Sequence, residues 1–185
     1  MERDAEATRR RLIAAGRAEF AAHGLNGARV DRIAAAAQSN KAQIYHYFGN
    51  KAGLFDAVWN ELVERVVTSV PLDADDLPGF AADLSDLYAR DPDMARIITW
   101  QRLEHDGALT DLGVAEVRTR SAAIAAAQAR GAVSTRFEPQ VLFALLVHLA
   151  MLWPAANPDV LTVVDLADAA QRRDLVRRMA AALVE

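Results

Sequence analysis

The feature that most constrains this sequence is a short stretch at residues 40–51, which is predicted to form a helix with both ends specified. Asn40 is suited to cap the helix, because its side chain can accept a hydrogen bond from an N–H group of the first turn. Gly49 is suited to end it, because glycine readily adopts the left-handed conformation found at helix C-termini. Ile44 and Phe48 lie four residues apart and share one face, so we expect both to pack inward.

The side chains left on the outer face of this helix have the chemistry of a DNA-reading surface. They are cations, an amide that can pair with adenine, and hydroxyl or imidazole groups that can bind phosphate. These candidates are Lys41, Gln43, Tyr45, His46, Tyr47 and Lys51. A second short helix, predicted at residues 30–37, precedes it across a turn at Gln38 and Ser39, which is typical of a helix-turn-helix. On this pattern alone, an ordinary structural pair of helices is an equally good interpretation.

Charge is distributed unevenly along the 185 residues, whose net charge is −4. Residues 1–51 contain nine basic and five acidic residues, a net of +4, so the remaining 12 basic and 20 acidic residues have a net of −8. Such asymmetry indicates a basic interaction module beside an acidic body. Mere scatter of surface charge is the alternative.

Several classes of protein are disfavoured by what the sequence lacks. It has no cysteine, no glycine-rich phosphate loop, no G-x-S-x-G motif and no His-x-x-x-His pair, so we expect no enzyme and no cofactor. The four histidines, at 23, 46, 105 and 148, do not have the spacing of metal ligands. The N-terminus has no apolar signal region, and the longest apolar run, at residues 141–153, is too short to span a bilayer. We therefore expect a cytoplasmic protein.

The apolar spacing predicts an all-α chain of about nine helices, with no strand-like alternation. An acidic loop at residues 71–79 is the clearest break, and proline or glycine separates most of the other helices. The helix at 138–153 is apolar on every side, which predicts burial on every side. The predicted helices are 4–23, 30–37, 40–49, 51–70, 80–90, 92–105, 110–130, 138–153 and 166–184.

Residues 12–55 resemble the N-terminal domain of the tetracycline-repressor family of transcription regulators. The resemblance departs from the family pattern at Arg29, where a threonine often caps the second helix, at Gln38, where the turn often has glycine, and at Ser39, which replaces a small apolar residue. The matching residues are Leu12, Ile13, Ala15, Phe20, Gly24, residues 30–34, the block at 44–51, Leu54 and Phe55.

The resemblance implies roles for individual residues. Lys41, Gln43 and Tyr45 would face the major groove, with Tyr45 and Tyr47 also close to phosphate. Lys51 would pair with a phosphate, and Arg29 would reach base edges or backbone. The position of His46 is either structural or in contact with DNA. The expected DNA-binding set is Arg29, Asn40, Lys41, Gln43, Tyr45, His46, Tyr47 and Lys51.

The resemblance also implies two domains with different functions. Residues 1–51 would form the helix-turn-helix DNA-binding domain, and residues 52–185 a helical effector-binding and dimerisation domain. The last two long helices would form the interface of a homodimer, since an all-round apolar helix needs more cover than one small bundle supplies. The alternative is that both helices belong to the core of a monomer.

The expected function is a ligand-responsive transcriptional regulator, most simply a repressor that a small-molecule effector releases from double-stranded operator DNA. Aromatic and polar residues of the body are candidates for an effector pocket, although each of them taken alone is more often ordinary core. These candidates are Trp59, Tyr88, Trp100, Gln101, Glu104, His105, His148 and Trp153. The alternative functions are a helical dimeric interaction module or an orphan DNA binder without an effector, and, more remotely, a cofactor-binding helical enzyme.

Overall fold

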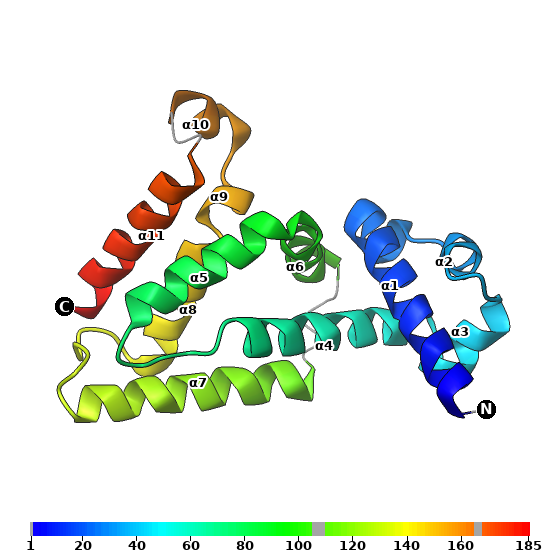
Figure 1. The fold of residues 1–185 in the computed structure, drawn as a ribbon, viewed down its shortest axis with the longest axis horizontal. Helices are drawn as coiled ribbons and strands as arrows, with labels where there is room; N and C mark the ends of the chain where they lie inside the picture. The colour runs from blue at the N-terminus through cyan, green and yellow to red at the C-terminus, as the bar shows by residue number, and fades with distance from the viewer. Residues whose placement is uncertain (1, 105–109, 165–167) are drawn as a thin grey trace. The chain divides into compact units, whose positions relative to one another are not determined.

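The computed structural model describes residues 2–104, 110–164 and 168–185, and the regular elements in these ranges are all helices (Figure 1). The all-α prediction is therefore confirmed. No helix in the described ranges is long and apolar enough to cross a membrane. In chain order the helices are α1 (Glu2–Gly27), α2 (Val30–Ala36), α3 (Lys41–Phe48), α4 (Lys51–Ser69), α5 (Leu77–Arg90), α6 (Pro92–Glu104), α7 (Asp111–Ala129), α8 (Pro139–Ala150), α9 (Leu152–Ala155), α10 (Pro158–Val163) and α11 (Ala169–Val184).

The chain packs as two compact units. Unit 1 consists of Met1–Glu64 together with Asp93–Thr110, and unit 2 consists of Arg65–Pro92 together with Asp111–Glu185. The boundary expected after residue 51 thus falls within unit 1, which also takes in α6. The division into residues 1–51 and 52–185 remains a proposed division of function and does not follow the packing.

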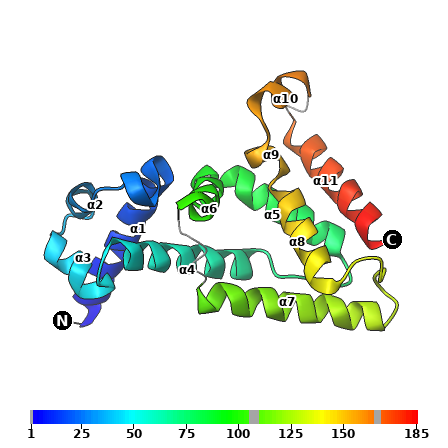
Figure 2. The ribbon, with the colours of Figure 1, turned by 180° about the vertical axis from the view of Figure 1, so that it is seen from behind.

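Unit 1 is built on the apolar faces of α1, α2 and α3, with the start of α4 completing its core (Figures 1 and 2). The rings of Phe20 and Phe55 meet edge to face, with centroids 5.1 Å apart. The spacing of these residues in the sequence predicted this inward face, because positions four apart lie on one side of a helix. The fully buried side chains here are Leu12, Phe20, Ile33, Ile44, Leu54 and Phe55.

The end of α1 is packed closely against α6 within unit 1. Gly24 interrupts the helical conformation with φ 68° and ψ −179°, as the predicted helix end there required. A Cβ atom added at Gly24 would lie 2.6 Å from Glu104 Oε2 and 2.8 Å from Trp100 Cε3. Trp100 Nε1 donates a hydrogen bond to the Ala21 carbonyl at 3.4 Å, and Asn26 N donates one to Glu104 Oε2 at 2.9 Å.

Unit 2 has α5 at its centre, with α8 and α11 packed against it and α7 packed against α8 (Figures 1 and 2). The Phe80 and Phe143 rings stack with centroids 6.3 Å apart and join α5 to α8. Buried apolar side chains from all four helices form this core. They include Leu77, Phe80, Leu84, Tyr88, Ile124, Leu142, Leu146, Val176 and Ala180.

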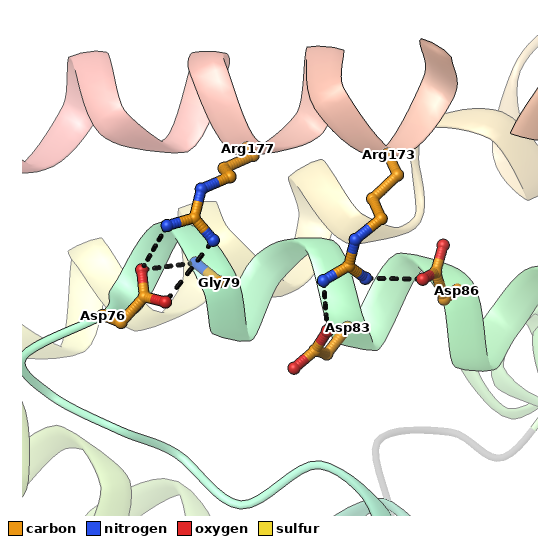
Figure 3. Close-up of polar contacts among 6 residues, drawn as sticks. All are labelled: Asp76, Gly79, Asp83, Asp86, Arg173 and Arg177. Atoms are coloured by element: carbon orange, nitrogen blue, oxygen red, sulfur yellow. Dashed lines mark hydrogen bonds and ion pairs between the residues drawn. The ribbon is translucent and has the colours of Figure 1, made fainter. Parts of the chain in front are cut away.

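Two arginines of α11 hold that helix to α5 (Figure 3). Arg173 donates to Asp86 Oδ2 at 2.5 Å and to Asp83 Oδ1 at 2.6 Å, and its hydrogen bond to Asp83 raises the pKa of Arg173 above its usual range. Arg177 contacts both carboxylate oxygens of Asp76, at 3.2 and 3.4 Å. Bidentate arginine–carboxylate pairs fix geometry as well as contributing energy. The register of α11 on α5 is therefore set by charge as well as by apolar packing.

Eleven helices are present among the described residues, where the sequence predicted about nine. The acidic loop expected at 71–79 ends earlier, since Asp76 accepts a hydrogen bond from Gly79 N and caps α5, which begins at Leu77. The helix expected at 138–153 divides at Met151 into α8 and α9. Asn157 caps a further short helix, α10, with Pro158 in its first turn. Proline and the capping residues thus formed extra turns rather than irregular chain.

The turn between α2 and α3 contains a residue in a conformation that favours glycine. Gln38 has φ 50°, which is in the left-handed region and costs a residue with a Cβ about 1–2 kcal/mol. Replacing Gln38 by glycine should therefore raise the free energy of unfolding, by about 0.5–1 kcal/mol after glycine's extra backbone entropy is counted. Denaturant unfolding of Q38G and Q38A measures this, and equal stabilisation by both would contradict the conformational explanation.

Candidate nucleic-acid interface

The helix α3 has the ends that its sequence predicted. Asn40 Oδ1 accepts a hydrogen bond from Gln43 N at 3.0 Å, and Gly49 follows the helix with φ 75°. Ile44 is fully buried, whereas Phe48 is half-buried and lies beneath the guanidinium of Arg9, whose Cζ is 5.8 Å from the ring centroid. The buried edge of α3 thus fixes it in unit 1, and its remaining face is left for contacts outside the chain.

The predicted DNA-contacting side chains of α3 share this outer face. Tyr45 is 51% exposed, which is unusual for a large aromatic side chain. His46 is exposed and meets the half-buried Tyr47 edge to face, with ring centroids 5.1 Å apart. Gln43 is half-buried and Lys41 is exposed. The structure therefore brings an amide, an ammonium group and two phenols together on one short helix.

Lys41 carries an ion pair at the start of α3. Its Nζ lies 2.7 Å from Asp31 Oδ1 on α2, and both side chains are exposed. Hydrogen bonding to Asp31 raises the pKa of Lys41 above its usual range, so the ammonium group keeps its charge. Asp31 therefore competes with any phosphate for this cation.

The ammonium group of Lys51, which was expected to bind a phosphate, makes hydrogen bonds within the protein itself. Its Nζ donates hydrogen bonds to the carbonyls of Asn26 and Ala28, at 3.2 and 3.0 Å. These bonds use two of the three N–H donors of the ammonium group and join the start of α4 to the turn between α1 and α2. A phosphate contact by Lys51 stays a proposal, and the group's structural role was not foreseen from the sequence.

Arg29 precedes α2 as its capping residue, but its side chain makes no capping hydrogen bond. Glu19 of α1 performs that task instead. Its Oε1 accepts from Arg29 N at 2.9 Å and from Arg32 Nε at 2.7 Å. Burial alone would raise the pKa of Glu19, but hydrogen bonds from Arg32 and Arg29 outweigh it and hold the pKa below the usual 4.5. The exposed Arg29 side chain is left available to contact DNA.

The lowered pKa of Glu19 predicts that unit 1 is sensitive to acid. Stability from ionised Glu19 is complete above its usual pKa of 4.5 and is lost as pH falls through the lowered pKa. E19Q should lower the free energy of unfolding at pH 6 by about 1–3 kcal/mol, the value of hydrogen bonds to a charged group. Thermal unfolding from pH 6 to pH 3 should show this deficit shrinking with acid, whereas the exposed E6Q control should show no deficit. A deficit of constant size would contradict the assignment.

The candidates for an effector pocket are divided between the two units. Trp59, Trp100, Gln101 and Glu104 belong to unit 1, whereas Tyr88, His148 and Trp153 belong to unit 2, and His105 lies outside the described residues. Trp100 and Glu104 hold the end of α1. Tyr88 is buried, which raises its pKa to about 12. The buried Trp153 Nε1 has no hydrogen-bond partner in the described part of the chain.

The outward face of α8 is not covered within the single chain. Leu142, Phe143, Leu146 and Ala150 are buried, but Val141 is 49% exposed. A hollow of about 310 Å³ on this face is lined by apolar atoms of Val141, Ala144 and Leu145, with Gln140 and His148 at its edges. His148 is thus exposed, and its Nδ1 lies 2.7 Å from the Ala144 carbonyl.

No group of three or more potential metal-ligating side chains occurs within the described ranges.

Two family models match the chain over most of its length. The model described as "Bacterial regulatory proteins, tetR family" matches residues 12–58, and the model described as "Tetracyclin repressor-like, C-terminal domain" matches residues 76–182. The first match covers the capped helix α3 and its supporting core, and the second covers α5 through most of α11.

Individual relatives agree with these models. The HTH-type transcriptional repressor SCO4008 of Streptomyces coelicolor is 37% identical over 168 residues, which cover 85% of this chain and 83% of that protein. The structure of SCO4942, a candidate transcriptional regulator from Streptomyces coelicolor, has 34% identity and a TM-score of 0.83, covering 96% of this chain and 98% of that one. AibR, solved with isovaleryl coenzyme A and operator DNA, shares the fold at 18% identity, covering 93% and 97% of the chains with a TM-score of 0.69.

Proposed function

Because the chain belongs to the tetracycline-repressor family of transcriptional regulators, we propose that it represses transcription by binding operator DNA as a homodimer, and that a small-molecule effector releases it. The observation that carries the proposal is the outer face of α3. It is a capped helix fixed by Ile44, and it presents an amide, a cation and phenols from a basic part of the chain. In this proposal the protein acts in the cytoplasm and catalyses no reaction.

The residues of this face have distinct proposed tasks. Gln43, Lys41 and Tyr45 read base edges in the major groove, where glutamine pairs with adenine and lysine with guanine. Tyr47, His46 and Arg29 contact phosphates, which fix the register of the helix without reading sequence. Asn40 supports them by capping α3, and Lys51 supports them through its bonds to the turn between α1 and α2.

The homodimer is proposed to form through the outward face of α8 together with α11. The exposed apolar face around Val141 is a surface that monomeric proteins usually cover. Leu175, Met179 and Leu183 of α11 are only half-buried in the single chain, so a second copy has apolar area to cover on both helices. A two-fold dimer reads two half-sites about 34 Å apart on the duplex.

An effector acts, in this proposal, by binding unequally to two geometries of the dimer. Its effect on operator affinity equals its difference in affinity for the DNA-competent and DNA-incompetent states. AibR, with its coenzyme A ester and operator DNA, is an example of this fold carrying both kinds of ligand.

The direct test is a gel shift with DNA from the protein's own upstream region. We expect a shifted band whose affinity falls steeply with salt, because phosphate contacts release counterions. Substitution of Gln43 by alanine should change the DNA sequence that the protein prefers. Substitution of Arg29 by alanine should lower the affinity for all DNA sequences equally. The absence of any shift at low salt would reject the proposed function, and equal behaviour of the two variants would reject the division of tasks.

Releasing Lys41 from its ion pair should strengthen DNA binding. D31N removes a negative charge from α2 and leaves the ammonium group of Lys41 free to contact the DNA. We expect operator affinity to rise roughly threefold to tenfold at low salt, with about one further counterion released. D75N is the matched control, because it breaks an exposed ion pair with Arg130 in unit 2. Fluorescence anisotropy at several salt concentrations measures both, and unchanged affinity of D31N would show that Lys41 is not held back.

A further inference from the structure

Arg120 is a buried cation that the proposed DNA contacts do not use. It lies in α7 with 7% of its surface exposed, among the apolar side chains of unit 2. A buried guanidinium is strongly unfavourable unless hydrogen bonds and an opposite charge compensate for the water that it loses. Burial indeed lowers the pKa of Arg120 from its usual range.

The partners of Arg120 within the described residues compensate only partly. Its Nη2 donates a hydrogen bond to the Val70 carbonyl at 3.3 Å, just beyond the C-terminal end of α4. The nearest carboxylate, that of Glu116, has its Oε2 3.8 Å from Nε, which is too far for a hydrogen bond. A guanidinium has five N–H donors, so this arrangement leaves most of its capacity unused.

Phe80 controls which part of the guanidinium is left for a ligand. The Arg120 Cζ lies 5.4 Å from the centroid of the Phe80 ring, which in turn stacks on Phe143. The N–H groups of a guanidinium lie in its own plane, where they match the two oxygens of a carboxylate. The ring thus lies against one side of the guanidinium, and an anion would be bound by the N–H groups that the Val70 carbonyl does not use.

Tyr88 supplies a second donor on the helix that carries Phe80. Burial raises its pKa to about 12, with the charge of Arg120 acting in the opposite direction, so the phenol keeps its proton near neutral pH. Phe80, Leu84 and Tyr88 are spaced by four residues on α5 and are all buried, so the phenol lies on the same face of α5 as the ring that contacts Arg120. Leu84, one turn from Tyr88 on α5, is fully apolar and buried.

We propose that the effector is an apolar carboxylic acid whose carboxylate binds the edge of the Arg120 guanidinium and accepts a hydrogen bond from the Tyr88 hydroxyl. The inference rests on the proposed function, since it names the chemical class of the effector. Arg120 is the one buried basic side chain among the residues that the structure describes, so a single negative charge fits better than a phosphate dianion. The surrounding Phe80, Leu84 and Phe143 suit an aliphatic or aromatic remainder.

The test compares acids with their uncharged counterparts. Octanoate, benzoate and 4-phenylbutyrate are titrated beside octanamide, benzamide and 4-phenylbutyramide, and binding is measured from the shift in melting temperature of the full chain. We expect at least one acid to bind tenfold or more tightly than its amide. R120M should remove this preference, because methionine fills a similar apolar volume and such replacements of buried charges usually fold. Y88F should weaken the acid several-fold while leaving amide binding unchanged.

The outcomes separate this inference from the proposed function. Equal binding of acids and amides, no acid binding in the panel, or full acid preference in R120M would overturn the carboxylate site. If R120M does not fold, the acid–amide ratio in the wild type and its fall in Y88F decide the question. A wild type that fails to bind DNA rejects the proposed function, whatever the acids do. A wild type that binds DNA and is released by amides alone keeps the function and rejects the inference.

Discussion

Replacing Gly24 by alanine should strongly destabilise unit 1. The glycine has φ 68° and ψ −179°, a region essentially reserved for glycine, which costs another residue about 1–3 kcal/mol. The added Cβ would also lie 2.8 Å from the Trp100 ring, and overpacking costs about a further 1–3 kcal/mol. We expect the free energy of unfolding to fall by about 2–6 kcal/mol in total.

Two other glycines separate the causes of this effect. Gly49 has φ 75° but open space around its missing Cβ, so G49A should cost the strain alone, about 1–2 kcal/mol. Gly27 has neither a positive φ nor a close neighbour, since its Cβ would lie 3.4 Å from His23 Cβ, and G27A should be nearly neutral. Denaturant unfolding of the three variants measures the order. If G24A lowers the free energy of unfolding no more than G49A does, the contact between α1 and α6 can accommodate an added methyl group without destabilisation.

Replacing Val141 by glutamate should dissociate the proposed homodimer into monomers and abolish tight operator binding. The two-fold operation would bury two glutamates on the outward faces of α8, and a buried unpaired charge is strongly unfavourable. Light scattering should return about 20 kDa, the mass of one chain, where the wild type returns about twice that. Operator affinity should fall by about 100-fold or more, because the two half-sites lose their linkage.

Val117 supplies the matched control for this variant. It is 46% exposed on α7, close to the 49% of Val141, but it lies away from the proposed interface. V117E should therefore keep both the dimer mass and the operator affinity. A V141E protein that remains dimeric would move the interface elsewhere, and loss of the dimer in both variants would point to general destabilisation.

Local rules were sufficient to predict much of unit 1. The cap at Asn40, the end at Gly49 and the burial of Ile44 depend on residues within one or two turns of each other. They can therefore be predicted from the nearby sequence. The all-α class follows in the same way from apolar spacing. The number of helices did not, because short capped turns such as α10 have no long periodic signal.

Contacts between distant residues could not be read in this way. Lys51 was interpreted as a phosphate ligand, but it also donates to carbonyls 23 and 25 residues earlier. Arg173 and Arg177 of α11 pair with carboxylates that stand 87 to 101 residues earlier in the chain, on α5 and at its cap. The burial of Arg120 was not foreseen, since the three residues before it in α7 are exposed and an arginine is rarely buried. Each of these contacts depends on which distant residues the fold brings together.

The pairing of α11 with α5 also has a consequence for biosynthesis. The carboxylates of Asp83 and Asp86 meet their arginine 90 and 87 residues later in the chain, close to its C-terminal end. At roughly 5–20 residues per second, translation leaves α5 without this partner for several seconds at least. Unit 1 needs nothing beyond residue 110, so the DNA-reading part can fold on the ribosome while the rest is still being made. A chain truncated before α11 would therefore contain a folded unit 1, but its helix α5 would lack the cover of α11. The exposed apolar surface would make such a chain a substrate for chaperones and proteases.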